Sequence, residues 1–179
     1  EGLSDKTSIK VATATTQMQL DLLPADWVRV HLQVPDFSPA KIPLLQDVEQ
    51  AEYELPIAGT VVRGGAVSVG NPHFVIEVDD VDAAPVDAWG AQLATHPMFP
   101  EGVNVGFVQR LTSNHLRLRV YERGVGETPA CGSGACAAAV VMRRWGKTDS
   151  KMTMQLPGGD LRVQWDEAQA ILLEGPADW

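Results

Sequence analysis

Hydrophobic and polar residues alternate along much of the chain, which predicts mostly β-strands. Two neighbouring alternating segments, residues 7–14 and 16–22, predict a β-hairpin. The turn between two later strands is expected at Pro157-Gly158-Gly159-Asp160. Alternation or β-branched enrichment between turn signals predicts the remaining strands, at residues 27–34, 61–69, 73–78, 104–111, 116–122, 152–156, 161–165 and 170–174.

Two stretches carry helical signals instead. The first helix is expected over residues 85–95, with a proline at its start, and the second over residues 133–145. The second has no charged residue over positions 134–142, carries two arginines in its last turn and is followed by Gly146. A helix that is apolar on all sides is buried.

Many strands together with one buried helix of small residues indicate an α+β fold. The expected architecture is a mixed, largely antiparallel sheet that curls into a barrel around a central helix. The small side chains of this helix would let the strands approach it closely. No internal repeat or low-complexity segment interrupts the pattern.

Composition and charge restrict the possible partners. The 179 residues carry a formal net charge of −9 and no basic cluster, so we expect no nucleic-acid partner. No apolar run reaches the length of a membrane span, so we expect no membrane partner. Two cysteines without framework spacing suit a reducing cytoplasm. No metal is expected, because the four histidines lack ligand-like spacing: His31, His73, His96 and His115.

Cys131 is the residue with the clearest chemical signal. It lies on a glycine-rich turn where the second helix begins, and free amides and the helix dipole favour anions there. We therefore expect a lowered pKa for the Cys131 thiol, and amides of Gly132 and Ser133 that stabilise negative charge. The alternative is a buried packing residue, which fits Cys136 better. A disulfide between the two cysteines is not expected, because five helical positions turn their side chains apart.

Five ordered motifs together resemble the diaminopimelate epimerase family. They run from the middle of the chain to near its end: Gly70-Asn71-Pro72-His73, Phe99-Pro100-Glu101 with Asn104-Val105-Gly106-Phe107, Val120-Tyr121-Glu122-Arg123-Gly124, Ala130-Cys131-Gly132-Ser133-Gly134-Ala135-Cys136, and Leu156-Pro157-Gly158-Gly159. The family's enzymes interconvert LL- and meso-diaminopimelate in lysine and peptidoglycan-precursor biosynthesis. They use no cofactor, and a small-molecule amino acid is the expected substrate.

The resemblance also implies a domain organisation. Residues 1–31 correspond to a remnant of the family's N-terminal domain and residues 32–179 to its C-terminal domain. The chain opens with Glu1 rather than methionine and begins almost at once with a strand, so we expect a piece of a longer protein. The family mechanism uses two cysteines, one on each domain, and only Cys131 has a counterpart here. This chain alone is therefore expected to be inactive, and the full-length protein to be a homodimer.

The family's functional residues map onto eight motif positions, and one of them, Glu122, has two roles. The resemblance gives catalytic roles to Cys131, His73 and Glu122, the last two adjusting the protonation of the cysteines. It gives substrate binding to Asn71, Asn104, Glu122, Arg123, Gly132 and Ser133. Without the motifs, the asparagines would be ordinary turn residues, and Glu122 and Arg123 a solvated ion pair.

Three other functions stay open at this point. A related cofactor-independent isomerase of the proline-racemase or phenazine-biosynthesis type would share the fold. Cys131 and His73 would alternatively form the nucleophile and base of a cysteine hydrolase, which passes through an acyl-enzyme. The third alternative is a non-catalytic domain that binds a small carboxylate.

Overall fold

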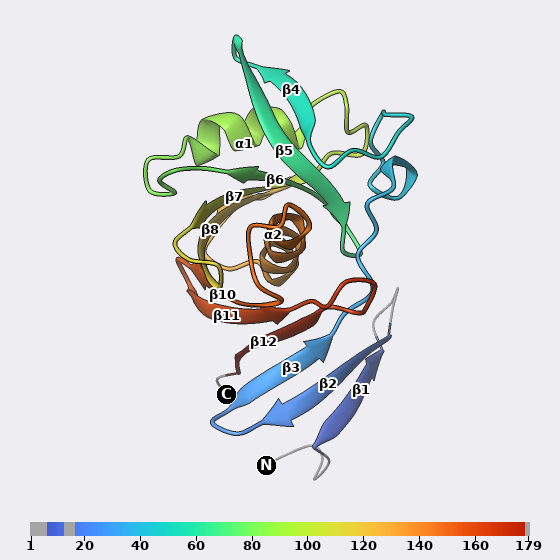
Figure 1. The fold of residues 1–179 in the computed structure, drawn as a ribbon, viewed down its shortest axis with the longest axis vertical. Helices are drawn as coiled ribbons and strands as arrows, with labels where there is room; N and C mark the ends of the chain where they lie inside the picture. Colours follow the sequence, from blue (N-terminus) through green and yellow to red (C-terminus); the bar gives the residue numbers. More distant parts are fainter. Residues whose placement is uncertain (1–6, 13–16, 178–179) are drawn as a thin grey trace.

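One buried helix organises the molecule. In the computed structural model, which describes residues 7–12 and 17–177, helix α2 (Gly132–Arg144) lies inside the curve of a single large sheet (Figure 1). Every residue from Gly134 to Met142 is buried, as the uncharged run predicts. Ala135, Ala137, Ala138 and Ala139 have no exposed surface, because strands pack around the helix on several sides.

The sheet is mixed and mostly antiparallel. Its order is β1-β2-β3-β12-β11-β10-β8-β7-β6-β5-β4, with β9 paired to β8. Only the β6–β7 and β8–β10 pairs are parallel among the described ladders. The strands are β1 (Ser8–Ala12), β2 (Gln17–Leu23), β3 (Trp27–His31), β4 (Tyr53–Ile57), β5 (Thr60–Ser68), β6 (Pro72–Glu77), β7 (Asn104–Arg110), β8 (His115–Glu122), β9 (Gly126–Thr128), β10 (Lys151–Leu156), β11 (Gly159–Gln164) and β12 (Leu172–Pro176).

The expected α+β class and central helix are confirmed, but the expected barrel is wrong. The sheet remains open, with β1 at one end of the strand order and β4 at the other. The chain after β3 crosses toward β5, where Asp36 and Ser68 form an isolated bridge with hydrogen bonds of 2.9 and 2.8 Å. We call this Asp36–Ser68 bridge the seam. It brings the two sides of the sheet together, but no ladder of strand pairing extends from it, so a barrel is not closed.

Helix α2 begins and ends where its sequence signals predict. Cys131 is the N-cap residue in an extended conformation, with φ −143° and ψ 103°. At the other end, Gly146 has φ +69° and donates to the Arg143 carbonyl (2.9 Å), while the Lys147 amide donates to the Met142 carbonyl (3.1 Å). This pattern satisfies carbonyls that a helix end leaves free, and the positive φ favours glycine.

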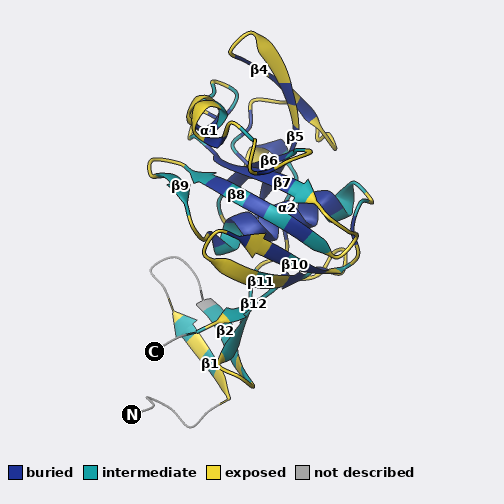
Figure 2. Ribbon diagram, turned by 90° about the vertical axis from the view of Figure 1, so that its left-hand side faces the viewer, coloured by how far each residue is buried: buried dark blue, intermediate teal, exposed yellow. Residues whose placement is uncertain are grey.

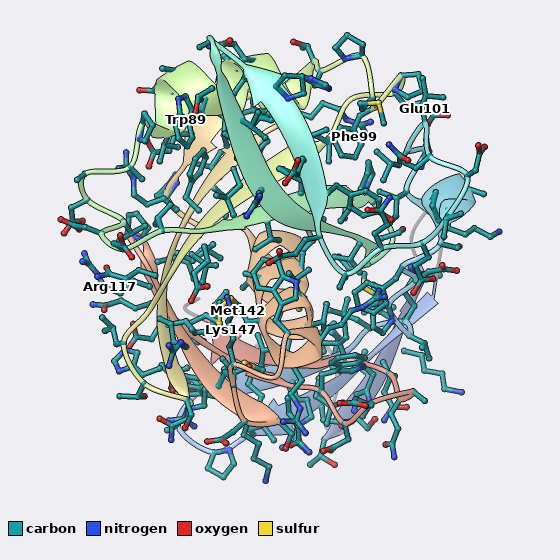
Figure 3. The ribbon with its side chains drawn as sticks, turned by 45° about the horizontal axis from the view of Figure 1, so that its top comes forward. Trp89, Phe99, Glu101, Arg117, Met142 and Lys147 are labelled. Carbon is teal, nitrogen blue, oxygen red and sulfur yellow. The ribbon has the colours of Figure 1, made fainter. Side chains whose placement is uncertain are left out.

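A second hydrophobic cluster lies on the outer side of the sheet, under helix α1 (Val86–Ala94) and the β4–β5 hairpin. Trp89 of α1 and Phe99 of the following loop both belong to this region (Figure 3). Strand β4 and the three-residue β9 were not among the predicted strands. The alternation in β4 is regular, but Pro56 lies within it, and proline is a signal against a central strand. A short 3₁₀ helix (Pro39–Lys41) precedes β4.

The first three strands differ from the rest in burial. The hairpin of β1 and β2 is confirmed in the described residues, while positions 13–16 of the two predicted strands lie outside them. Strands β1, β2 and β3 extend the sheet beyond α2, and Figure 2 shows them half-exposed or exposed where α2 is buried. Their pairing with β12 joins them to the main sheet.

Candidate active site

The topology brings the predicted site residues to one end of the sheet. Strands β6 and β7 run parallel with His73 opposite Asn104, so both begin at this end. Strand β8 is antiparallel to β7 and therefore finishes there, with Glu122 as its last residue. Helix α2 starts beside them at Cys131, because β9 and a short connection return the chain from β8.

The Cys131 thiol is enclosed by the first turn of α2. Its exposed fraction is 7%, and its Sγ accepts a hydrogen bond from the Gly134 amide at 3.4 Å. The Ser133 hydroxyl lies 3.6 Å from the same sulfur. The amides of Gly132 and Ser133 have no intrahelical acceptor, as at any helix start. This arrangement suits a thiol that becomes negatively charged during a reaction.

The pKa of Cys131 differs from the sequence-based expectation. Burial raises the pKa of the thiol, and the nearby negative charge of Glu122 raises it further. The hydrogen bonds from Ser133 and Gly134 act in the opposite direction but are outweighed. The expectation of a lowered pKa is therefore wrong for this structure, because the cost of burying a thiolate was not visible in the motif. Cys131 is a protonated thiol at neutral pH.

A short chain of polar contacts leads from Cys131 to a buried histidine. Asn71 Nδ2 donates to Ser133 Oγ at 3.4 Å, which makes Asn71 Oδ1 the acceptor for His73 Nε2–H at 3.0 Å. His73 has no exposed surface, and its Nδ1 has no hydrogen-bond partner among the described residues. Asn71, Ser133 and Cys131 thus form one contact network with His73 at its inner end.

His73 is neutral in this environment. Burial is the main cause that lowers its pKa to about 3, and the positive charge of Arg123 adds to the effect. The described hydrogen bonds of Cys131 go to Ser133 and Gly134 rather than to His73. A cysteine hydrolase needs a base bonded to its nucleophile, so this geometry disfavours the hydrolase alternative.

Glu122 is held by a residue that the sequence did not single out. Its Oε1 accepts a hydrogen bond of 2.6 Å from Thr128 Oγ1 across the β8–β9 pair. Glu122 also lies close enough to Cys131 to influence the pKa of the thiol. Thr128 stands in the stretch that leads to Cys131, but only the strand pairing shows that it faces Glu122.

Asn104 and Arg123 contact each other at the same end of the sheet. Asn104 is buried, and its side-chain amide accepts from the Arg123 backbone (3.0 Å) and donates to the Pro72 carbonyl (3.2 Å). The guanidinium of the exposed Arg123 donates to the carbonyls of Glu101 and Gly102. Both ends of the Asn104 amide are therefore occupied by backbone, and Asn104 fixes the chain around Arg123.

Close packing around the helix start leaves little room for side chains. A Cβ on Gly134 would lie 2.9 Å from Val120 and 3.2 Å from the Cys131 sulfur. A Cβ on Gly132 would lie 3.1 Å from Leu173 of β12. Gly134 therefore allows the thiol to sit against its own helix, and Leu173 was missed as a neighbour because it is distant in sequence.

Three surface cavities lie away from Cys131. Three cavities, of about 390, 320 and 290 Å³, are lined by described residues that do not include Cys131. The described residues form no group of three or more His, Cys, Asp or Glu side chains suited to a metal ion. Across residues 7–12 and 17–177, no helix has the length and apolar character needed to cross a membrane.

Sequence comparison identifies the family. A model of the diaminopimelate epimerase family matches residues 65–179, and the diaminopimelate epimerase of Legionella pneumophila is 49% identical over 178 residues. This chain belongs to the diaminopimelate epimerase family. The alignment covers 98% of the chain and 64% of the Legionella protein. A diaminopimelate epimerase from Xanthomonas campestris is also 49% identical, over 99% of this chain and 63% of its own length. The chain thus spans under two thirds of these relatives.

The fold of this diaminopimelate epimerase family member is also similar to those of solved structures. A hydroxyproline epimerase from Agrobacterium vitis matches with a TM-score of 0.66 and 16% identity, over 98% of this chain and 59% of that one. A phenazine biosynthesis protein from Bacillus anthracis matches with a TM-score of 0.60 and 14% identity, over 97% and 67%. At these identities the comparison concerns the fold alone.

Proposed function

We propose that the protein containing this chain is a diaminopimelate epimerase that interconverts the LL and meso forms of its substrate with two cysteines and no cofactor. The observation that carries the proposal is Cys131 at the start of a buried helix, with Ser133, Asn71 and Glu122 around it, in a member of this family. The second cysteine would come from the part of the longer protein outside this chain.

Cys131 is proposed to act as the proton donor at the start of a turnover. The raised pKa of its thiol keeps the proton in place until substrate binds. In the reaction, the other cysteine's thiolate takes the α-proton, which breaks a C–H bond and forms an S–H bond. Cys131 then gives its proton to the opposite face of the same carbon. The resulting Cys131 thiolate is stabilised by the Gly134 amide and the Ser133 hydroxyl.

The other predicted residues receive supporting roles in this proposal. The free amides of Gly132 and Ser133 would bind the α-carboxylate, since a helix start favours anions. His73 Nδ1 is buried and without a described partner, so it can accept a hydrogen bond from the missing thiol. Asn71 and Arg123 would contact the substrate. The negative charge of Glu122 near the sulfur would help to keep the Cys131 thiol protonated.

We also propose that residues 1–31 belong to a second domain. The strand registers place one apolar face across β1, β2, β3 and β12, formed by Ile9, Val11, Met18, Leu20, Leu22, Val28, Val30 and Leu173. Leu22 is 40% exposed and none of the β1–β3 members is buried. Such a face normally packs against another element. The part of the longer relatives that this chain lacks is the proposed cover, and the family resemblance further implies a cytoplasmic homodimer.

The decisive experiment follows the α-proton of LL-diaminopimelate by NMR in D₂O with the full-length protein. We expect deuterium incorporation together with meso product, and loss of both in the Cys131→Ala variant. Exchange without meso product would point to a one-face proton transfer. No exchange with this substrate, but exchange with proline or hydroxyproline, would move the function to a sister isomerase of the same fold.

The same assay applied to residues 1–179 tests the role of the missing part. We expect no turnover, because only one of the two cysteines is present. Binding of a hydrophobic dye should be stronger for this chain than for the full-length protein, since the β1–β3 face is uncovered. Turnover by the isolated chain that Cys131→Ala abolishes would overturn the two-cysteine proposal.

A further inference from the structure

The turn between β10 and β11 touches the segment that leads to Cys131. Leu156 pairs with Gly159, so Pro157 and Gly158 form the turn itself. The Gly158 amide donates a 2.7 Å hydrogen bond to the carbonyl of Pro129, two residues before Cys131. This contact joins two parts of the chain that are almost thirty residues apart.

Gly158 is a glycine for reasons of space rather than backbone conformation. Its φ lies outside the left-handed region, whereas the neighbouring Gly159 has φ +133°. A Cβ on Gly158 would lie 2.9 Å from the oxygen and 3.2 Å from the carbonyl carbon of Pro129. These are backbone atoms, which cannot rotate away as a side chain can. A Cβ on Gly159 would meet nothing within 4 Å.

The contacted segment also carries the partner of Glu122. Thr128, which bonds Glu122 at 2.6 Å, directly precedes Pro129. Cys131, at the other end of the segment, is the N-cap of α2. A displacement of the Pro129 carbonyl would therefore move the catalytic sulfur and the charge beside it in the same step.

We propose that Gly158 is a positioning residue that sets the location of Cys131 through the Pro129 carbonyl. The inference rests on the proposed function for its catalytic consequence, although the contact itself does not. The segment that leads to Cys131 is therefore fixed by two contacts. The β10–β11 turn contacts it through the Gly158–Pro129 hydrogen bond, and α2 contacts it through the hydrogen bond from the Gly134 amide to Cys131 Sγ. Catalytic groups lose activity when they shift by even 1 Å.

The test compares Gly158→Ala with Gly159→Ala in the full-length protein. Both changes perturb the same turn, but only Gly158→Ala adds an atom against Pro129. For Gly158→Ala we expect kcat to fall by about 10- to 100-fold with KM changed less than about 3-fold. We expect Gly159→Ala to lower the melting temperature through backbone strain, with kcat of the folded enzyme within about 3-fold of wild type.

A second readout requires no substrate. The rate at which iodoacetamide alkylates Cys131, followed by peptide mass spectrometry across pH, reports the surroundings of the thiol. Gly158→Ala should change the rate or shift the midpoint of this profile, and Gly159→Ala should leave it unchanged. A shifted profile in a protein that does not turn over diaminopimelate would reject the proposed function but retain the positioning role.

A variant from the other side of the contact covers the case in which Gly158→Ala does not fold. Pro129→Gly keeps the carbonyl and adds no atom, but it loosens the segment. We expect the same direction of change in kcat and in Cys131 alkylation. The proposal is overturned if Gly158→Ala matches Gly159→Ala in both readouts, or if Pro129→Gly leaves both unchanged.

Discussion

The first turn of helix α2 and the following stretch from Cys136 to Met142 have opposite surroundings. At its start, Cys131 contacts Ser133 and the Gly134 amide, and the polar network continues to Asn71. From Cys136 to Met142 every residue of the helix is buried in the main hydrophobic cluster. Two cysteines five residues apart therefore have different surroundings: Cys131 contacts polar groups, and Cys136 lies in the apolar core.

The largest expected effect separates the two cysteines. Cys131→Ala should reduce α-proton exchange in the full-length protein by at least about 10²- to 10⁴-fold, since it removes a general acid. The melting temperature should also fall modestly, because the variant loses a buried thiol that caps α2 and accepts the hydrogen bond of the Gly134 amide. Deuterium exchange by NMR and thermal melting of the same samples provide the measurement.

Cys136→Ala is the matched control for that experiment. It should retain activity and lose about 1 kcal/mol of stability, the usual size for a small core change. Its thiol is fully buried, and burial raises its pKa strongly, so it should also resist alkylation in the folded protein. Loss of exchange in both variants, or in neither, would show that the different surroundings of Cys131 and Cys136 are unrelated to catalysis.

The next effect concerns stability in acid and is due to His73, at the inner end of the polar network beside the start of α2. The pKa of His73 is about 3 when folded, against 6.5 for an ordinary histidine, so the unfolded chain binds a proton first as the pH falls. His73 therefore costs no stability above pH 6.5 and destabilises the folded state progressively below it. From pH 7 to pH 5 this amounts to about 2 kcal/mol.

Urea unfolding at both pH values measures this cost. His73→Gln should remove most of the pH-dependent loss, whatever its effect on stability at pH 7. Asn71→Ala, which removes the hydrogen-bond partner but keeps the imidazole, should retain it. An unchanged pH dependence in His73→Gln would mean that the buried histidine is not the group responsible.

The smallest effect compares a glycine at each end. Gly134→Ala should cost about 1 kcal/mol, because the gain in helix propensity is opposed by contact with Val120 and the Cys131 sulfur. Gly146→Ala should cost a similar amount for another reason, since φ +69° is unfavourable for alanine in open space.

Thermal melting alone would not distinguish these two glycine variants. Alkylation of Cys131 should, because the added methyl group at position 134 touches the sulfur and the one at position 146 does not. Equal alkylation rates in both variants would contradict the close fit of the thiol against the first turn.

Helix α2 could be predicted from the sequence more accurately than the sheet around it. The uncharged run of α2, its arginines and Gly146 predict the helix to within a residue, because burial and helix ends depend on local sequence. The strands around it were mostly found by alternation. Strand β4 was missed since Pro56 interrupts it, and the open seam was missed because single-strand patterns do not report sheet closure.

The sequence indicated which residues form the candidate site, but not their burial, their pKa values or their contacts with distant segments. The motifs assigned Asn71, Ser133 and Cys131 to one site, and in the structure Asn71 contacts Ser133, which contacts Cys131. The raised pKa of Cys131 depends on burial, which the motif does not encode. The contacts of Thr128 with Glu122 and of Gly158 with Pro129 depend on strand pairing between distant segments.

The four alanines of α2 allow the sheet to curve tightly around the helix. Because each presents only a methyl group to the strands, the two sides of the sheet can still meet at Asp36 and Ser68. A wider helix would need a longer circumference, and the seam is held by two backbone hydrogen bonds rather than by a ladder. Relatives that carry bulkier residues at these positions should therefore show a separated seam, while the strand order around the rest of the helix stays the same.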